Sequence, residues 1–344
     1  MARACGVLNY AALIASDVGM PDLAADLCWR QHRIFASAGR LAGDIAVMSL
    51  MPLVNISRLL TRDGDGAAAY DVLTRLYRAA QKREAAVIHG RTVDLAALVR
   101  TDADHRKVCE ELWITVLVDG ARALARIGRW TEAADAMTKH RGIANRLLDG
   151  RQIKIMSLME RGLGQEALDL IDSTVPTEPW ENTVAALLRA HCQPTSSPLQ
   201  QQDLDVVLQQ ATALVSEPDP STALFQTRVG LSALELDPAS IIPAATLLRS
   251  AVADAARRDA YAAREVLDSH ATRTRLSSEH KQSLNAVITS SGLAAGTLPR
   301  AHLQSLTDAA TLAEATLSDL LAPGRSTNRE VGTAGQAAQA TPSR

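Results

Sequence analysis

The sequence predicts an all-α fold built from antiparallel helical hairpins, and two observations support this prediction. Aromatic residues make up only 3% of the 344 residues, whereas hydrophobic residues make up 47%, so the interior must consist mainly of aliphatic side chains. Ala and Leu are the strongest helix formers and pack closely between helices, while strand-rich proteins use more aromatic and β-branched residues. The second observation is a short pattern of glycine and alanine that recurs along the first half of the chain.

In this recurring pattern, a glycine ends one helical stretch and an alanine follows five residues later in the next. The four copies are Gly19–Ala24, Gly64–Ala69, Gly128–Ala133 and Gly162–Ala167. Glycine ends a helix at low cost because it can adopt the left-handed conformation, and the alanine must be small because two helices cross there. We expect a second small residue seven positions before each glycine. The chain has Ala12, Ser57 and Ala121 there, whereas the fourth copy has Ile155.

Gly128 and Gly162 lie 34 residues apart, which is the repeat length of tetratricopeptide proteins. The stretch 119–141, DGARALARIGRWTEAADAMTKHR, resembles that family in its order of helix, glycine turn, acidic residue, alanine and second helix. The resemblance covers residues 4–175 with interruptions. It implies that the hairpins stack as a tetratricopeptide-like, right-handed α-solenoid. The Ala/Arg/Asp-rich composition is also similar to that of actinobacterial repeat proteins.

The spacing of the copies and the composition predict four regions. Residues 1–192 form the repeat region, and 87–106 is a candidate insertion because Gly64 and Gly128 are 64 residues apart; a degenerate hairpin is the alternative. The Pro/Ser-rich segment 193–199 predicts a linker, residues 200–322 a second all-helical region, and 323–344 a disordered tail without periodic apolar residues. Helices are expected at 180–192, 201–215, 221–235, 239–269 with a break near Asp259, 277–290 and 300–321.

Charge and motifs argue against several classes of function. The net charge of −2 gives no overall electrostatic attraction to nucleic acid or to an anionic membrane, and the basic cluster at 139–154 is interpreted as a solvated helix face. No apolar run approaches the roughly 20 residues that span a bilayer. The N-terminus lacks the features of a secretory signal, so we expect a cytoplasmic protein. The four cysteines form no C-x-x-C pair, so neither a metal nor a disulfide is expected.

Enzymatic motifs are also absent from the sequence. There is no H-E-x-x-H, no G-x-S-x-G and no phosphate-binding G-x-x-x-x-G-K-[ST]. The pair Gly162 and Gly164 resembles part of a dinucleotide fingerprint, but it follows a predicted helix and a true fingerprint follows a strand. We therefore expect a protein without catalytic activity or cofactor, and an enzyme with an unmarked site is the least favoured alternative.

The resemblance also implies a binding groove. In the tetratricopeptide family, certain positions on the first helix of each hairpin point into a concave groove. Counting from each turn glycine places amides and arginines there: Asn9, Asn55, Arg58, Arg62, Arg122, Arg126 and Gln152. The arginines come in two i,i+4 pairs, so each pair shares a helix face.

These residue types suit an extended peptide with an acidic segment. Arginine can hold a carboxylate or phosphate through two hydrogen bonds, and asparagine can pair with peptide backbone. In the alternative interpretation, the arginines pair with acidic neighbours such as Asp17 and Glu160. The predicted function is a scaffold for a protein or peptide, and homo-oligomers are compatible with it. The alternative is a regulatory or accessory subunit that docks on an enzyme in a specialised biosynthetic or signalling system.

Overall fold

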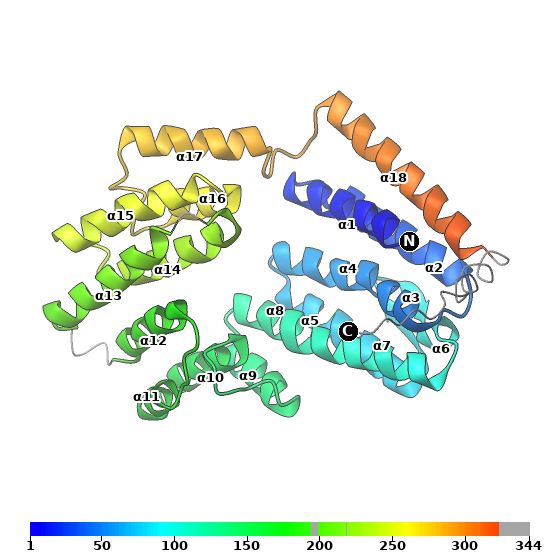
Figure 1. Ribbon diagram of the computed structural model, residues 1–344, viewed down its shortest axis with the longest axis horizontal. Coiled ribbons are helices and arrows are strands. Elements are labelled where there is room, and N and C mark those ends of the chain that lie inside the picture. The colour runs from blue at the N-terminus through cyan, green and yellow to red at the C-terminus, as the bar shows by residue number, and fades with distance from the viewer. Residues whose placement is uncertain (194–198, 218, 323–344) are drawn as a thin grey trace, which may run out of the picture.

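The computed structural model describes residues 1–193, 199–217 and 219–322, and it is mostly helical, which confirms the all-α fold class (Figure 1). The helices of the first half are α1 (Ala2–Asp17), α2 (Pro21–Ser37), α3 (Gly43–Met48), α4 (Met51–Arg62), α5 (Gly66–Lys82), α6 (Leu95–Leu98), α7 (Asp102–Thr115), α8 (Ala121–Arg126) and α9 (Trp130–Lys139), with a π-helical turn at Val116–Gly120 between α7 and α8.

The second half is helical as well. Its helices are α10 (Asp149–Glu160), α11 (Gly164–Asp172), α12 (Pro179–Cys192), α13 (Gln201–Val215), α14 (Ala223–Glu235), α15 (Pro243–Ala256), α16 (Ala260–Asp268), α17 (Ser278–Ser291) and α18 (Arg300–Leu321), with a 3₁₀ turn at Pro220–Thr222. The predicted helices in this half are confirmed to within a few residues. The long stretch 239–269 is two helices, and the chain breaks between them at 257–259, where the Asp259 side chain caps the backbone N–H of Ala262.

All four turn glycines adopt the predicted left-handed conformation, with φ between 73° and 87°. The four alanines five residues later are fully buried, as are the residues seven positions before the glycines. Ile155 in the fourth copy is buried too, so that hairpin accommodates a larger side chain at this position. The turn chemistry read from the sequence therefore describes the four hairpins α1–α2, α4–α5, α8–α9 and α10–α11.

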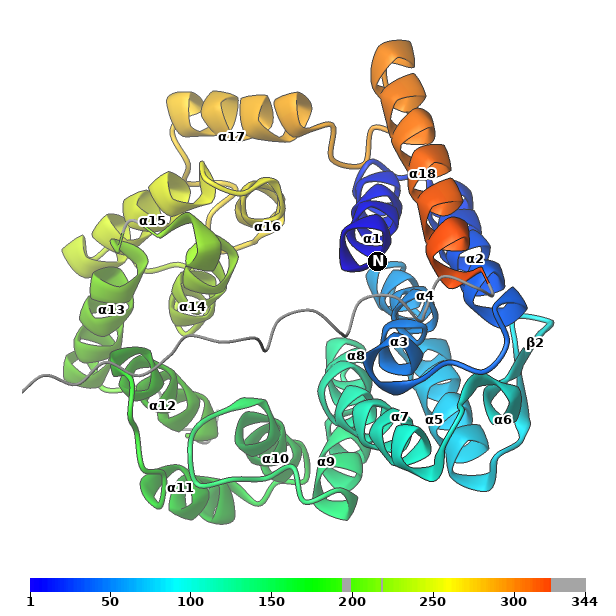
Figure 2. The same ribbon diagram turned by 45° about the vertical axis from the view of Figure 1, so that its right-hand side comes forward.

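Most helices pack against helices close to them in the sequence, and the helices follow one another round a ring (Figure 2). The ring closes where the loop between α17 and α18 meets the turn between α1 and α2. There the backbone N–H of Ala294 donates to the carbonyl of Asp17 at 2.8 Å, and that of Gly296 donates to the carbonyl of Val18 at 2.7 Å.

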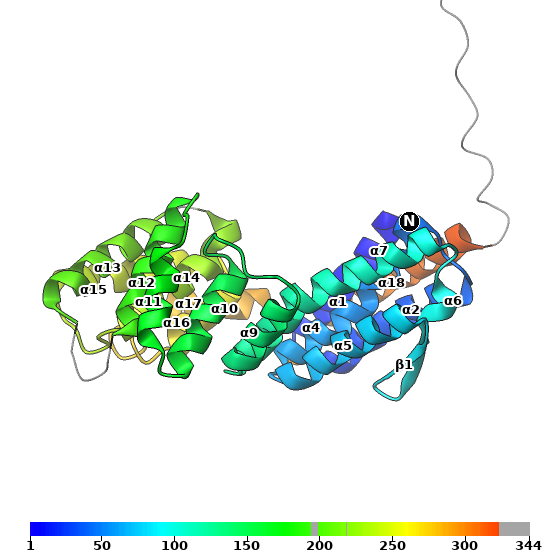
Figure 3. The same ribbon diagram turned by 90° about the horizontal axis from the view of Figure 1, so that it is seen from below.

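The hydrophobic cores divide the chain differently from the predicted boundary at residue 200. One core joins α1–α7 with Ala310, Ala313 and Leu317 of α18, and a second runs from Leu147 to Leu284. A small core around α8 and α9 lies between them. The last helix of the predicted region 200–322 therefore packs with the first helices of the chain, as Figure 3 also shows.

A two-stranded antiparallel sheet, which the sequence analysis did not anticipate, begins just before the candidate insertion 87–106. Its strands are β1 (Ala85–Ile88) and β2 (Arg91–Asp94), joined by His89 and Gly90, which both have positive φ. Two such residues are typical of a tight hairpin turn. The hairpin projects from the helices (Figure 3), and the Arg91 guanidinium lies 4.9 Å from the Trp29 ring centroid.

Two sequence predictions fall wholly or mainly outside the described residues: the linker 193–199, of which 194–198 are not described, and the tail 323–344. Within the described part, the stretch Gly43–Arg62 is long and apolar enough to cross a membrane by composition, with a mean hydropathy of 1.3 in its most apolar window. Just over half of that window, 56%, is buried inside the structure. Core helices pass the same test, so the predicted cytoplasmic location stays a prediction.

Replacing Ala133 by Leu should destabilise the fold by about 1–3 kcal/mol, because the larger side chain overpacks the crossing of α8 and α9. Ala133 and Ala121 on the facing helix are both fully buried. The helix pattern predicts that Ala136 lies on the outward side of α9, but this prediction is wrong: Ala136 is buried as well, and α9 packs against α10 in addition to α8.

The matched control is therefore Ala67→Leu on the exposed side of α5, which should change stability by less than about 0.5 kcal/mol. Urea unfolding followed by circular dichroism measures both variants. Equal stabilities would contradict the close helix crossing.

Candidate functional site

The candidate site is the inner wall, which we define as the exposed side of the first helix of each hairpin: α1, α4, the π-helical turn with α8, and α10. The opposite sides of these helices are buried in the cores. Six of the seven side chains predicted for the groove are at least partly exposed on this wall, whereas the seventh, Asn55, is buried. Several of these side chains, however, are bound to other residues of the chain, whereas in a free groove they would be open to a partner.

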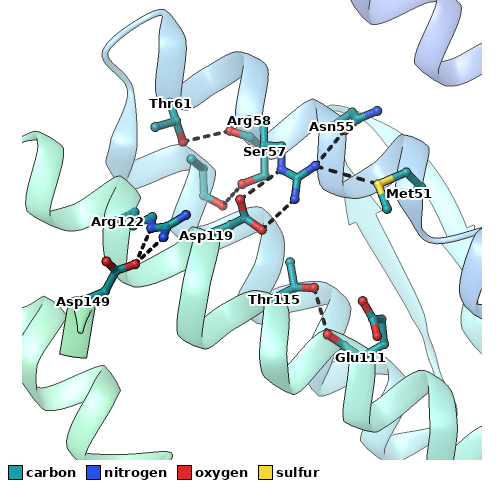
Figure 4. Close-up of polar contacts among 11 residues, drawn as sticks. Met51, Asn55, Ser57, Arg58, Thr61, Glu111, Thr115, Asp119, Arg122 and Asp149 are labelled. Carbon is teal, nitrogen blue, oxygen red and sulfur yellow. Dashed lines mark hydrogen bonds and ion pairs between the residues drawn. The ribbon is translucent and has the colours of Figure 1, made fainter. Parts of the chain in front are cut away.

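Three of the four predicted arginines form ion pairs that connect successive hairpins. Figure 4 shows the pairs of Arg58 and Arg122. Arg58 of α4 binds Asp119 of the π-helical turn through two hydrogen bonds, of 3.0 and 3.1 Å. Arg122 of α8 binds Asp149 at the start of α10, and Arg62 binds Asp17 at the end of α1. The alternative interpretation, in which arginines pair with acidic neighbours, therefore describes these three side chains.

The two predicted asparagines contact each other. The Asn55 amide donates to the Asn9 side-chain oxygen at 3.2 Å, and Arg58 approaches the Asn55 oxygen at 3.4 Å. Asn55 is buried, so its amide is engaged within the wall. Asn9 and Arg58 also line a cavity of about 240 Å³ between α1, α4 and α7, whose other walls are mainly apolar.

A larger cavity of about 710 Å³, the central cavity, brings together three further predicted residues, Arg122, Arg126 and Gln152. It lies where α4, α8 and α10 face α12 and α14 across the ring. Its lining is Thr61, Arg122, Ala125, Arg126, Trp130, Asp149, Gln152, Ile153, Met156, Leu188, Arg228 and Ser232. The cavity therefore joins a cationic side to an apolar floor with one aromatic ring.

The central cavity is positively charged in a chain whose net charge is −2. Three arginines and a single carboxylate, Asp149, line it. Arg126 is exposed and forms no ion pair with any described residue, whereas Arg228 is held by Glu265 of α16 through both carboxylate oxygens. Arg122 keeps 60% of its side chain exposed despite its pairing with Asp149.

The Asp17 carboxylate links the inner wall to the other half of the ring. It accepts hydrogen bonds from Arg62 and from the hydroxyl of Tyr261 on α16. Burial of Tyr261, together with this hydrogen bond to a carboxylate, raises the pKa of the phenol to about 12. Tyr261 therefore stays a neutral hydrogen-bond donor to Asp17 across the neutral pH range.

The basic cluster at 139–154 is dispersed in the structure. Arg146 binds the buried Glu181 of α12, and Arg151 is buried, where it donates to the carbonyl oxygens of Ala144 and Leu170. Burial lowers the pKa of the Arg151 guanidinium. These two arginines hold loops to helices, so they do not belong to a basic face.

Asp119, Asp149 and Arg228 are site residues that the sequence did not predict. Asp119 escaped because counting from Gly128 assumes an unbroken α-helix, and the π-helical turn shifts the register by placing one extra residue in the turn. Asp149 begins α10 at a point where no repeat position predicts a helix start. Arg228 lies in the second half, where no turn glycine provides a reference position.

One pair of side chains resembles a catalytic dyad. Cys109 Sγ lies 3.5 Å from His105 Nε2, but this nitrogen contacts the carbonyl oxygen of Ala80 at 2.8 Å. A carbonyl only accepts, so Nε2 carries the proton and has no lone pair with which to deprotonate the thiol. Burial also raises the pKa of Cys109. Among the described residues, no group of three or more His, Cys, Asp or Glu side chains could hold a metal ion.

Comparison of the chain with protein-family models, with curated proteins and with solved structures gives no match. The resemblance to tetratricopeptide proteins therefore rests on the turn pattern.

Proposed function

We propose that this chain is a non-catalytic binding scaffold, a tetratricopeptide-like right-handed α-solenoid whose inner wall holds an extended acidic segment of a partner protein. The observation that carries the proposal is the central cavity. It brings three arginines from two halves of the chain to one hollow, with Trp130, Ile153 and Met156 as an apolar floor.

The cavity chemistry favours a peptide with alternating acidic and apolar side chains. Guanidinium groups bind carboxylates through paired hydrogen bonds, and methionine offers an adaptable apolar surface. Gln152 also lines the cavity, and its amide nitrogen donates to the Leu147 carbonyl at 2.7 Å. Its side-chain oxygen remains as an acceptor for a peptide N–H.

The ion pairs along the wall support this role because they orient the arginines before the partner arrives. A guanidinium has five N–H donors, and Arg122 uses only part of them for Asp149. Orienting a long side chain in advance reduces the entropy lost on binding. Arg126, which has no carboxylate partner among the described residues, is the side chain whose charge is most available to an incoming carboxylate.

Reversing the charge of Arg126, as Arg126→Glu, should weaken binding of an acidic peptide by about 10- to 100-fold, since a hydrogen bond to a charged group is worth about 1.5–3 kcal/mol. The probes are fluorescein-labelled peptides of about ten residues in which Glu alternates with Leu, and matched peptides in which Gln replaces every Glu. Fluorescence anisotropy gives the dissociation constants.

The control is Arg75→Glu, which makes the same charge change on α5, where Arg75 pairs with Asp71 one turn earlier on the same helix. This variant should bind the acidic peptides like the unmodified chain, and added salt should weaken binding in both. If the Gln peptides bind as tightly as the Glu peptides, or if Arg126→Glu has no effect, the inner wall is not an acidic-peptide site.

A further inference from the structure

A second basic cavity lies on the opposite half of the ring from α4 and α8, and the proposed function does not use it. It is enclosed by α15, the start of α17 and the loop before α17, which lie side by side in Figure 1. Its volume is about 360 Å³, and we call it the α15–α17 cavity. Its lining is Thr246, Arg249, Ser250, Arg275, Leu276, Ser277 and His280. No carboxylate is among these residues.

Arg249 is a buried positive charge at the base of this cavity. Its Nε donates to the carbonyl of Ala271 at 3.1 Å, and Nη2 donates to the carbonyls of Ser240 at 2.8 Å and Pro238 at 3.2 Å. Only 7% of the residue is exposed. These carbonyl oxygens accept from Nε and Nη2 but do not neutralise the charge, and burying a charge without an ion-pair partner is costly.

Arg275 adds a second positive charge on the rim. It is exposed, and one of its nitrogens donates to the carbonyl of Ala239 at 2.9 Å. Burial, and then the nearby Arg275, lower the pKa of Arg249, which indicates that the two guanidiniums repel each other across the cavity. An anion between them would relieve this repulsion.

Arg151 is another buried arginine of this chain, and its surroundings differ from those of Arg249. Arg151 is buried to a similar extent and likewise donates to backbone carbonyls. It lines none of the cavities described above, and hydroxyls of Ser173 and Thr174 accept its remaining bonds. A buried arginine can therefore hold loops to helices without a second cation beside it. Arg249 differs because it lines a cavity and has a second cation, Arg275, beside it.

Three hydroxyls complete the lining. Thr246 and Ser250 are one turn apart on α15, so they share a helix face, and Ser277 caps the first turn of α17 by accepting from the backbone N–H of His280 at 3.1 Å. Two carboxylates lie near the lining: Asp254 approaches His280 Nε2 at 3.7 Å, and Asp237 raises the pKa of Arg249 against the larger opposing effects of burial and Arg275. Asp254 therefore contacts the histidine from outside the cavity lining.

We propose that the α15–α17 cavity binds the phosphate group of a small phosphorylated molecule. Arg249 and Arg275 supply the charge, and the hydroxyls of Thr246 and Ser250 supply further donors, which suits a tetrahedral dianion with several acceptor oxygens. The cavity has no aromatic residue in its lining, so it offers no surface on which a nucleotide base could stack. A phosphate monoester with a polar carbon skeleton fits this lining, and a nucleotide does not.

Inorganic phosphate, glucose 6-phosphate and AMP are the probes, added to the full chain near pH 7.5 at constant ionic strength set with potassium chloride. Isothermal titration calorimetry should show binding of the first two probes, with glucose 6-phosphate at least as tight as inorganic phosphate. Arg275→Ala should weaken both by about tenfold or more, because it removes a charge-assisted hydrogen bond. Thr246→Val with Ser250→Ala should also weaken both while leaving Arg249 and the loops in place.

The control is Arg273→Ala, which removes another exposed arginine, two residues earlier, that does not line the cavity. Its affinities should equal those of the unmodified chain. Absence of phosphate binding, or equal binding by the Arg275→Ala and Arg273→Ala variants, would overturn the proposal. Binding of AMP in preference to both other probes would overturn the restriction to small phosphate esters. Acidic-peptide binding should be unchanged in Arg275→Ala.

Discussion

Replacing Glu181 by glutamine should lower the free energy of unfolding near pH 7 by about 2–3 kcal/mol, somewhat below the scale of breaking a fully buried ion pair, because the partner Arg146 keeps 38% of its side chain exposed. Glu181 is completely buried at the start of α12. Its carboxylate accepts from Arg146, at 2.6 Å for Nη2, and from the backbone N–H groups of Leu147, Thr177 and Glu178. Glutamine keeps the shape but lacks the charge, and its NH₂ group would face donors.

The effect of Glu181 should depend on pH in a defined direction. The Arg146 guanidinium and the backbone N–H groups lower the pKa of this carboxyl to about 2, from an ordinary value of 4.5. A depressed pKa in the folded state stabilises the fold above the unfolded pKa, and this stabilisation is lost as the pH falls through the folded value. The difference between the unmodified chain and Glu181→Gln should therefore be constant above about pH 5.5 and shrink from about pH 4.5 downward.

Urea unfolding at several pH values between about 3 and 7 tests both statements. The matched control is Asp172→Asn, which removes the carboxylate of the exposed pair with Arg189 between α11 and α12. Exposed pairs contribute about 0–1 kcal/mol, so this variant should unfold almost like the unmodified chain. A loss from Glu181→Gln that matches the loss from Asp172→Asn would show that the Glu181 site contributes no more than a surface pair.

The hairpins were predictable because their turns are local. Each turn needs a glycine with positive φ and, five residues later, an alanine where two helices cross closely. This spacing can be read from the sequence, and Gly128 with Ala133 is the clearest example. The strand pair at Ala85–Ile88 and Arg91–Asp94 was missed because four-residue strands give almost no periodicity. The packing of α18 against α1 was also missed, because a contact between chain ends leaves no local pattern.

The inner wall was predictable in outline, and its charge pairing was not. Helical spacing placed Arg58 and Arg122 on the exposed sides of their helices. Which carboxylate each one binds depends on how neighbouring hairpins are stacked, and the π-helical turn brought Asp119 into reach of Arg58. Arg228 reaches the central cavity only because the ring closes, and ring closure rests on contacts between residues about 280 positions apart, such as Ala294 with Asp17.

The stacking of the second and third hairpins depends on Gly66, and replacing it by alanine should destabilise the fold by about 3 kcal/mol. Gly66 is buried at the start of α5, where it touches α8. A Cβ at this position would collide with the carbonyl oxygen of Ala123, would lie 2.9 Å from the carbonyl carbon and would lie 3.1 Å from Ile127. Because the obstacle is backbone, a side-chain rotation cannot relieve it, and α5 must move away from α8.

Gly164 is the matched control, because it begins α11 two residues after its turn glycine, as Gly66 begins α5. A Cβ at Gly164 would meet only the carbonyl oxygen of Cys192, at an ordinary distance of 3.4 Å. Gly164→Ala should therefore leave stability unchanged or raise it by up to about 1 kcal/mol, since alanine reduces the freedom of the unfolded chain. Urea unfolding of the two variants measures the contrast, and equal effects would show that α5 and α8 are not in backbone contact at Gly66. Because α4 and the π-helical turn belong to these two hairpins, displacement of α5 should also separate Arg58 from Asp119.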